Sequence, residues 1–222
     1  MKSVRAGVLA VAMLVAGAPV TTAGSLLVGL HAGASGPTHD FGDAVDTGFQ
    51  GTVSGTWMIG AGWGVGADVG YQRWGGNDDL NGVFRLGDEL SGAIPPSQAE
   101  VRLSAVQLTA HGLYRYPTAG GTMPWLKAGL GLYVLSSDLA NAQMVALDAS
   151  KSYFGFNVGV GVDFPVSARY ALGVEAGYQR IELGKLDSDL SNFDEDNWYV
   201  LFFEKAETFT FGVNLTWGGG SR

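Results

Sequence analysis

The chain has 222 residues, 35 of them glycine and none of them cysteine, with 15% charged and 11% aromatic residues and a formal net charge of -8. The charged fraction is well below the ~25% of ordinary soluble domains, which argues against a cytosolic globule. The missing cysteine excludes disulfides, thiolate metal sites and cysteine nucleophiles. A chain this acidic is also not expected to bind nucleic-acid phosphates.

The N-terminus has the pattern of a secretory signal. Basic residues Lys2 and Arg5 precede an apolar run over residues 6–18 and a stretch of small residues. We therefore predict a cleaved signal peptide at 1–23 and a mature domain at 24–222. The mature part has no uninterrupted apolar stretch of the ~20 residues that a spanning helix needs, so a membrane-spanning mature chain must be a closed β-barrel.

The stretch 208–217 carries the clearest secondary-structure signal. Its side chains alternate with period two, which predicts a β-strand. One parity is large and apolar, and the other is small or polar, as expected with lipid outside a barrel and a narrow wet lumen inside. The apolar parity contains Phe209, Phe211, Val213, Leu215 and Trp217.

Seven earlier stretches show the same alternation. They are residues 26–35, 49–59, 64–74, 103–116, 124–135, 152–164 and 170–181. The connections between the eight stretches alternate long and short, with the long ones at 36–48, 75–102, 136–151 and 182–206. Outer-membrane barrels have long outer loops and short periplasmic turns. The sequence thus predicts an all-β fold, an eight-stranded antiparallel up-and-down transmembrane β-barrel.

An octapeptide occurs twice, at residues 66–73 as GADVGYQR and at 173–180 as GVEAGYQR. Each copy places a carboxylate on the lumen parity and a tyrosine on the lipid parity. Aromatic residues near strand ends are expected to form the interfacial girdles of a barrel. This set comprises Trp57, Tyr71, Trp74, Tyr114, Tyr116, Trp125, Phe164, Tyr178 and Trp217.

These features resemble the small outer-membrane barrels of the OmpA and OmpX type. The likeness rests on Val106-Gln-Leu-Thr-Ala110 with the following His111-Gly-Leu-Tyr, on the repeated octapeptide, and on the last strand. The resemblance implies an assembly signal in the last strand, read by the barrel-assembly machinery, at Thr210, Gly212, Leu215 and Trp217. The family has a lysine where this chain has His111, so the lysine's part in a central salt-bridge cluster does not carry over. The wall-anchoring periplasmic domain of OmpA has no counterpart before Arg222, so we expect no anchoring function.

Five charged or titratable residues share the lumen parity: Asp68, His111, Arg115, Lys127 and Glu175. Opposite charges in a narrow lumen are expected to pair, and eight strands leave an interior just wide enough for side chains to fill. We predict that this lumen charge cluster plugs the barrel, with a switchable gate as the alternative.

No catalytic residue, metal or cofactor is predicted. A lipid-modifying enzyme would need a hydroxyl nucleophile beside a histidine on a lipid-facing strand, and neither His39 nor His111 has one. The predicted function is a structural or surface-interaction protein of the bacterial outer membrane. A narrow channel or carrier for small apolar molecules, and a lipopolysaccharide-modifying enzyme, are the alternatives. Expected partners are membrane lipid and lipopolysaccharide, the assembly machinery and an extracellular molecule bound by the loops, with the protein itself a monomer.

Overall fold

The computed structural model describes residues 25–78, 81, 100–116, 118–140, 149–184 and 204–218. The predicted signal peptide at 1–23 lies outside the described residues. The described residues form the elements β1 (Leu26–Thr38), α2 (His39–Ala44), β2 (Gly48–Gly60), β3 (Trp63–Gly75), β4 (Glu100–Arg115), β5 (Met123–Ala140), β6 (Ala149–Pro165), β7 (Tyr170–Glu182) and β8 (Lys205–Gly218). The described part of the chain has no helix with the length and apolar character to cross a membrane.

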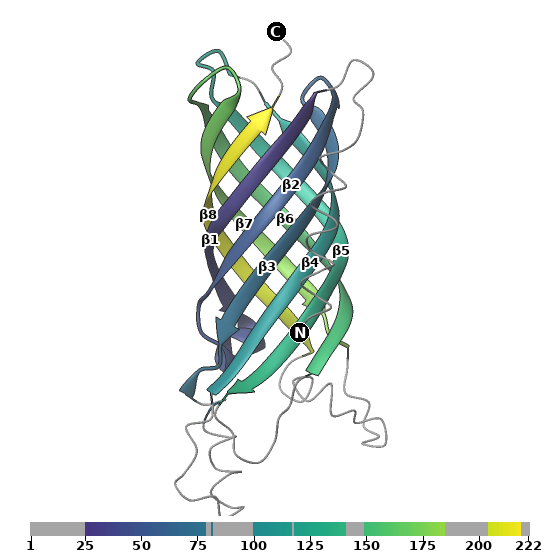
Figure 1. Ribbon diagram of the computed structural model, residues 1–222, viewed down its shortest axis with the longest axis vertical. Coiled ribbons are helices and arrows are strands. Elements are labelled where there is room, and N and C mark those ends of the chain that lie inside the picture. The colour runs from purple at the N-terminus through teal and green to yellow at the C-terminus, as the bar shows by residue number, and fades with distance from the viewer. Residues whose placement is uncertain are drawn as a thin grey trace, which may run out of the picture.

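The strands form one closed ring (Figure 1). Each strand pairs antiparallel with the next in sequence, and β8 returns to pair with β1, from Leu27 opposite Gly218 to Thr38 opposite Glu207. Closure leaves no strand edge without backbone partners, which is the condition for a sheet to persist in lipid. The predicted eight-stranded antiparallel barrel is confirmed.

The two ends of the barrel differ in their connections. At the short-turn end, the upper end of Figure 1, the strands are joined at residues 61–62, 116–122 and 166–169. The first of these turns needs glycine at Gly62, where φ is +85° and an added Cβ would lie 2.2 Å from the backbone oxygen of Arg115. The other end, here called the long-loop end, carries the longer connections.

Several strands extend further toward the long-loop end than the sequence predicts. β4 begins at Glu100 instead of residue 103, β5 continues to Ala140 instead of 135, and β6 begins at Ala149 instead of 152. The helix α2 lies within the predicted loop 36–48. The predicted loops are therefore shorter than expected, and the ring of strands is taller.

The outer face carries a broad apolar band. Side chains such as Leu30, Val65, Leu108, Val174 and Val213 are between 47% and 62% exposed. A soluble protein would not leave so many large apolar side chains in contact with water. The band is the surface expected to face lipid in a transmembrane barrel.

The inner face at the long-loop end is apolar. Thirteen buried side chains form one cluster there, here called the apolar plug: Phe41, Ala44, Val45, Trp74, Val101, Leu103, Ala105, Tyr133, Leu135, Tyr153, Ile181, Leu183 and Ala206. The helix α2 contributes Phe41, whose ring meets that of Trp74 edge to face at 5.4 Å. The barrel is thus filled with hydrophobic side chains at this end.

Two tryptophans were wrongly predicted for the interfacial girdle. Trp74 is 1% exposed and Trp125 is 7% exposed, and both lie inside the barrel. Their positions in β3 and β5 have the inward parity, which decides the face of a strand on which a side chain lies. Parity therefore predicts the face on which a tryptophan lies better than its proximity to a strand end does.

Candidate functional site

The inner face between the apolar plug and the short-turn end is polar, and its centre is Asp68 of β3. The Asp68 Oδ2 atom lies 3.3 Å from Lys127 Nζ and 3.1 Å from His111 Nδ1. The Thr109 hydroxyl donates a hydrogen bond to the same oxygen at 3.3 Å, and Thr56 Oγ1 lies 2.8 Å from the other ring nitrogen of His111. Because β3, β4 and β5 are adjacent, three of the predicted cluster residues meet on one wall of the lumen.

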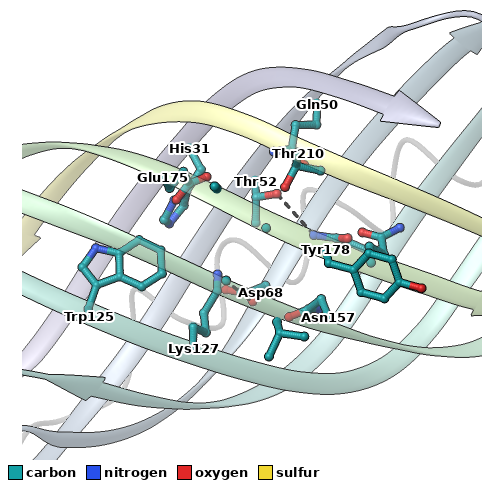
Figure 2. A pocket seen from close by; sticks show the side chains of 16 residues that line it. His31, Gln50, Thr52, Asp68, Trp125, Lys127, Asn157, Glu175, Tyr178 and Thr210 are labelled. Atoms are coloured by element: carbon teal, nitrogen blue, oxygen red, sulfur yellow. Dashed lines mark hydrogen bonds and ion pairs between the residues drawn. The ribbon is translucent and has the colours of Figure 1, made fainter. Parts of the chain in front are cut away.

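A second pair lies on the wall formed by β1, β7 and β8. His31 Nδ1 is 2.6 Å from Glu175 Oε2, and His31 Nε2 is 3.0 Å from Ser54 Oγ. His31 and Glu175 belong to strands that are not neighbours, and β8 runs between them. Gly212 stands in β8 directly beside Glu175, so no side chain separates the two groups. Figure 2 shows His31 next to Glu175, apart from Lys127 and Asp68.

Arg115 lies nearer the short-turn end and pairs with Asp163 of β6. The Asp163 carboxylate also accepts hydrogen bonds from Trp125 Nε1 at 3.0 Å and from Asn214 Nδ2 at 2.8 Å. Thr216 Oγ1 lies 3.5 Å from it. Asp163 is 2% exposed, so this carboxylate is a buried hub with its charge paired and its oxygens occupied.

The two copies of the repeated octapeptide contact each other across the lumen. Gln72 Nε2 donates a hydrogen bond of 2.6 Å to Gln179 Oε1, and the two residues hold the same place in their copies. The Ser35 hydroxyl donates to Gln72 Oε1 at 3.4 Å, and Trp74 Nε1 donates to Ser35 Oγ at 3.1 Å. This chain of hydrogen bonds joins the polar lumen to the apolar plug, so polar side chains border the plug on the side that faces the short-turn end.

Two small cavities, of about 50 Å³ and 30 Å³, lie among these side chains. His31, Trp125 and Lys127 line both and so lie between them. The larger cavity is bordered by Asp68 and Gln107, whose Oδ1 and Oε1 atoms have no hydrogen-bond partner in the described protein. A space of about 10–15 Å³ holds one water, so the cavities have room for roughly four and two waters.

The five predicted cluster residues are thus distributed over three groups. Asp68, His111 and Lys127 come together, Glu175 pairs with His31, and Arg115 pairs with Asp163. The predicted cluster included neither His31 nor Asp163. The inward parity of Asp163 in β6 was the available signal, since it is the single carboxylate of that strand.

A further charged group lies on the outer face, beyond the apolar band at the long-loop end. Glu207 Oε1 accepts a hydrogen bond of 2.7 Å from the Tyr178 hydroxyl and lies 3.5 Å from Arg180. Its Oε2 is 3.0 Å from His39 and 3.4 Å from Lys205. Burial opposes ionisation of Glu207, but the Tyr178 hydrogen bond and the neighbouring charges of Lys205 and His39 outweigh it, so the pKa of this carboxyl lies below its usual value.

The predicted assembly-signal residues lie in β8 and point to both faces. Leu215 and Trp217 are 36% and 50% exposed on the apolar band, and Thr210 borders the larger lumen cavity. Recognition by the assembly machinery remains a prediction. In the described part of the chain, no group of three or more His, Asp or Glu side chains is arranged to hold a metal ion.

Comparisons with known proteins agree with the fold. The model of the family described as "Outer membrane protein beta-barrel domain" matches residues 6–216. Neisserial surface protein A is 17% identical, with 88% of this chain and 99% of that chain covered and a TM-score of 0.52. A major outer membrane protein from Thermus thermophilus is 15% identical, with 88% and 100% covered and a TM-score of 0.49.

The attachment invasion locus protein Ail of Yersinia pestis, solved with the heparin analogue sucrose octasulfate, is 13% identical, with 88% and 100% covered and a TM-score of 0.47. A comparison with curated proteins finds no match. At these identities, the likeness to solved structures concerns the fold alone.

Proposed function

The chain belongs to the outer membrane protein β-barrel family, and we propose that it is a non-conducting barrel that holds its long connections at the cell surface for interaction with other molecules. In this family's architecture, short turns face the periplasm and long loops face the exterior. The short-turn end is accordingly the periplasmic end, and the long-loop end is the extracellular end.

The apolar plug is the observation that carries this proposal. An ion entering from outside would have to pass thirteen buried side chains, among them Leu103, Tyr133 and Leu135, each fully inaccessible to solvent. Between the plug and the short-turn end, the charged groups pair with one another, and each of the two cavities described among them has room for only a few waters. Transfer of an ion into such surroundings without hydration is strongly unfavourable.

Conductance in planar lipid bilayers tests this part of the proposal. The purified barrel is expected to give no current steps above the lipid baseline at applied voltages of either sign. A positive control barrel with an open lumen must give steps under the same conditions. Reproducible steps from the chain itself, retained after repurification, would contradict a closed lumen.

The surface-interaction role is tested through the extracellular connections. Acidic residues occur in all four, including Asp40 and Asp43 in α2 and the run Asp194-Glu195-Asp196. Cells that express the wild-type barrel are compared with cells whose residues 185–203 are replaced by a short Gly/Ser linker. Reduced binding to a host-cell or matrix-coated surface, at equal barrel abundance, is the expected result. Equal binding by both strains would argue against a role for this connection.

One arrangement favours a second candidate, a hydrolase. Ser54, His31 and Glu175 stand in the order of a hydroxyl, a base and an acid, with contacts of 3.0 Å and 2.6 Å, as in serine hydrolases. Ser54 is 8% exposed, however, and borders the cavity of about 30 Å³, which has no room for an ester substrate. A structural role is therefore the better proposal.

Labelling with a fluorophosphonate probe separates the two candidates. We expect no labelling of the folded barrel, and Ser54→Ala should leave the probe signal unchanged. Stoichiometric labelling that disappears in Ser54→Ala and in His31→Ala would support the hydrolase instead.

A further inference from the structure

The repeated octapeptide ends in an arginine in each copy, and these two residues, Arg73 and Arg180, occupy equivalent places on the outer face. Each follows an inward glutamine by one residue and an outward tyrosine by two, Tyr71 in β3 and Tyr178 in β7. Both arginines therefore stand at the level where the apolar band of the outer face gives way to polar side chains. The lumen groups already described do not include either of them.

The surroundings of the two arginines differ. Arg180 Nε lies 2.5 Å from Glu182 Oε1, and Arg180 Nη1 lies 3.5 Å from Glu207 Oε1. Two carboxylates therefore neutralise the Arg180 guanidinium. Arg73 has Phe49 and Ser104 as its direct cross-strand neighbours. Among the described residues, no carboxylate lies within ion-pair distance of Arg73.

Arg73 also has apolar side chains on one side and open space on the other. Toward the membrane centre, Phe49 and Tyr71 are 55% and 40% exposed, with their ring centroids 6.2 Å apart. Toward the exterior, Gly75 follows on the same face, and a Cβ added there would meet no atom within 4 Å. The hydroxyl-bearing Ser104 stands beside Arg73 on β4.

We propose that Arg73 binds the phosphate group of a lipid in the outer leaflet, with Ser104 beside it and with Phe49 and Tyr71 against the acyl chains of that lipid. A guanidinium presents two parallel N–H groups to phosphate oxygens, and it retains its charge at any physiological pH. Gly75 places no side chain of its own where the headgroup would lie, and an added Cβ there would meet no atom within 4 Å. Arg180 cannot serve equally, because a lipid phosphate there would face Glu182 and Glu207.

The pair of equivalent arginines supplies a matched control. Arg73→Gln and Arg180→Gln change the net charge equally, on the same face and at the same level. Both variants and the wild type are prepared in detergent micelles, and each is titrated with bisphosphorylated lipid A while complexes are counted by native mass spectrometry. Heat-modifiable electrophoretic mobility verifies that each barrel is folded.

Arg73→Gln is expected to weaken lipid A binding by about tenfold or more, which is the range for a lost charge-assisted hydrogen bond. Arg180→Gln should change lipid A binding by less than about twofold, because it removes only an exposed ion pair. Arg73→Lys should restore part of the loss, since it keeps the charge without the two parallel donors. Fully dephosphorylated lipid A should bind the wild type as weakly as bisphosphorylated lipid A binds Arg73→Gln.

Equal weakening by the two glutamine variants would overturn the proposal, because it would indicate attraction to the overall charge. No weakening by Arg73→Gln would overturn it as well. A competition experiment with inorganic phosphate completes the test. Displacement of lipid A by phosphate at equal concentration would identify a site for the free anion and contradict a lipid site. None of these outcomes bears on conductance, so the proposed function is tested separately.

Discussion

The membrane half and the long-loop half of the barrel are built from the same strands but have opposite polarity. In β4, Leu108 points outward and is 47% exposed, while its neighbour Thr109 is buried in the lumen. Nearer the long-loop end, Leu103 is fully buried and Ser104 lies on the outer face. The alternation continues without a break, but the apolar side changes. The solvent outside the wall, lipid or water, therefore decides which parity is apolar.

The lumen in the membrane half is expected to depend on charge pairing, so its loss should have the largest effect. Lys127→Ala removes the cation 3.3 Å from Asp68, a side chain that is 1% exposed. Removing one partner of a buried pair costs up to about 3–5 kcal/mol. We expect a matching loss in the free energy of unfolding, measured by urea titration in lipid vesicles.

Lys205→Ala is the control for this prediction. Lys205 is also paired with a carboxylate, Glu207, but it lies on the outer face and its side chain is 33% exposed. It should cost about 1 kcal/mol or less. Equal losses in the free energy of unfolding for the two variants would show that the buried Lys127–Asp68 pair stabilises the barrel no more than the exposed Lys205–Glu207 pair.

The long-loop half is expected to depend on apolar packing instead. Leu103→Ala in the plug should cost about 2–5 kcal/mol, since it leaves a cavity among rigidly packed side chains. Leu108→Ala, five residues further in the same strand, faces the apolar band, where lipid chains fill the space. It should cost less in the same urea titration. A larger cost at Leu108 than at Leu103 would contradict the assignment of the plug.

The polarity of the outer face in the membrane half can be broken with a single charge. Val158→Arg places a cation against lipid and should cost about 2–4 kcal/mol near the bilayer midplane. Asn157 faces the lumen and donates a 3.1 Å hydrogen bond to Tyr133. Asn157→Ser should therefore be tolerated better than Val158→Arg. Equal tolerance at the two positions would refute the assignment of inner and outer faces.

The smallest expected effect concerns pH at the boundary between the halves. Because the pKa of Glu207 lies below its usual value in the folded state, ionised Glu207 stabilises the fold above the ordinary glutamate pKa. This contribution is lost as the pH falls through the lower, folded-state value. Wild type should lose more stability in acid than Glu207→Gln, by about 1 kcal/mol or less. If Glu207→Gln lost as much stability in acid as wild type, Glu207 would be excluded as a cause of the acid sensitivity.

The change of polarity also explains how far the sequence could predict the fold. Eight strands and their faces were predictable in the membrane half, because large apolar side chains occupy one parity in every strand. Residues 100–105 alternate equally well, but with Glu100 and Arg102 outward and Val101 and Leu103 inward. Because polar residues precede it, the part at 100–102 is predicted as the end of a loop, and the strand is predicted to begin only at Leu103. The helix α2 has six residues, too few to show a helical period.

The lumen was predictable by parity but not by pairing. The inward positions of Asp68, Lys127 and Glu175 follow from the alternation alone. Their partners depend on the stagger between strands and on which glycines leave an open path across the lumen, as Gly212 does for His31 and Glu175. Neither quantity can be derived from the period of a single strand, because both are properties of the closed ring.

The reversal of polarity along β4 is the central claim, and single-cysteine spin labelling tests it most directly. The chain contains no cysteine, so every label reports one site. Nitroxides at the outward positions Arg102, Ser104, Val106, Leu108 and Ala110 are compared in lipid vesicles by their collisions with oxygen and with a water-soluble nickel chelate. We expect oxygen to dominate at Val106, Leu108 and Ala110, and the nickel chelate at Arg102 and Ser104. Oxygen dominance at all five positions, or at none, would contradict the account.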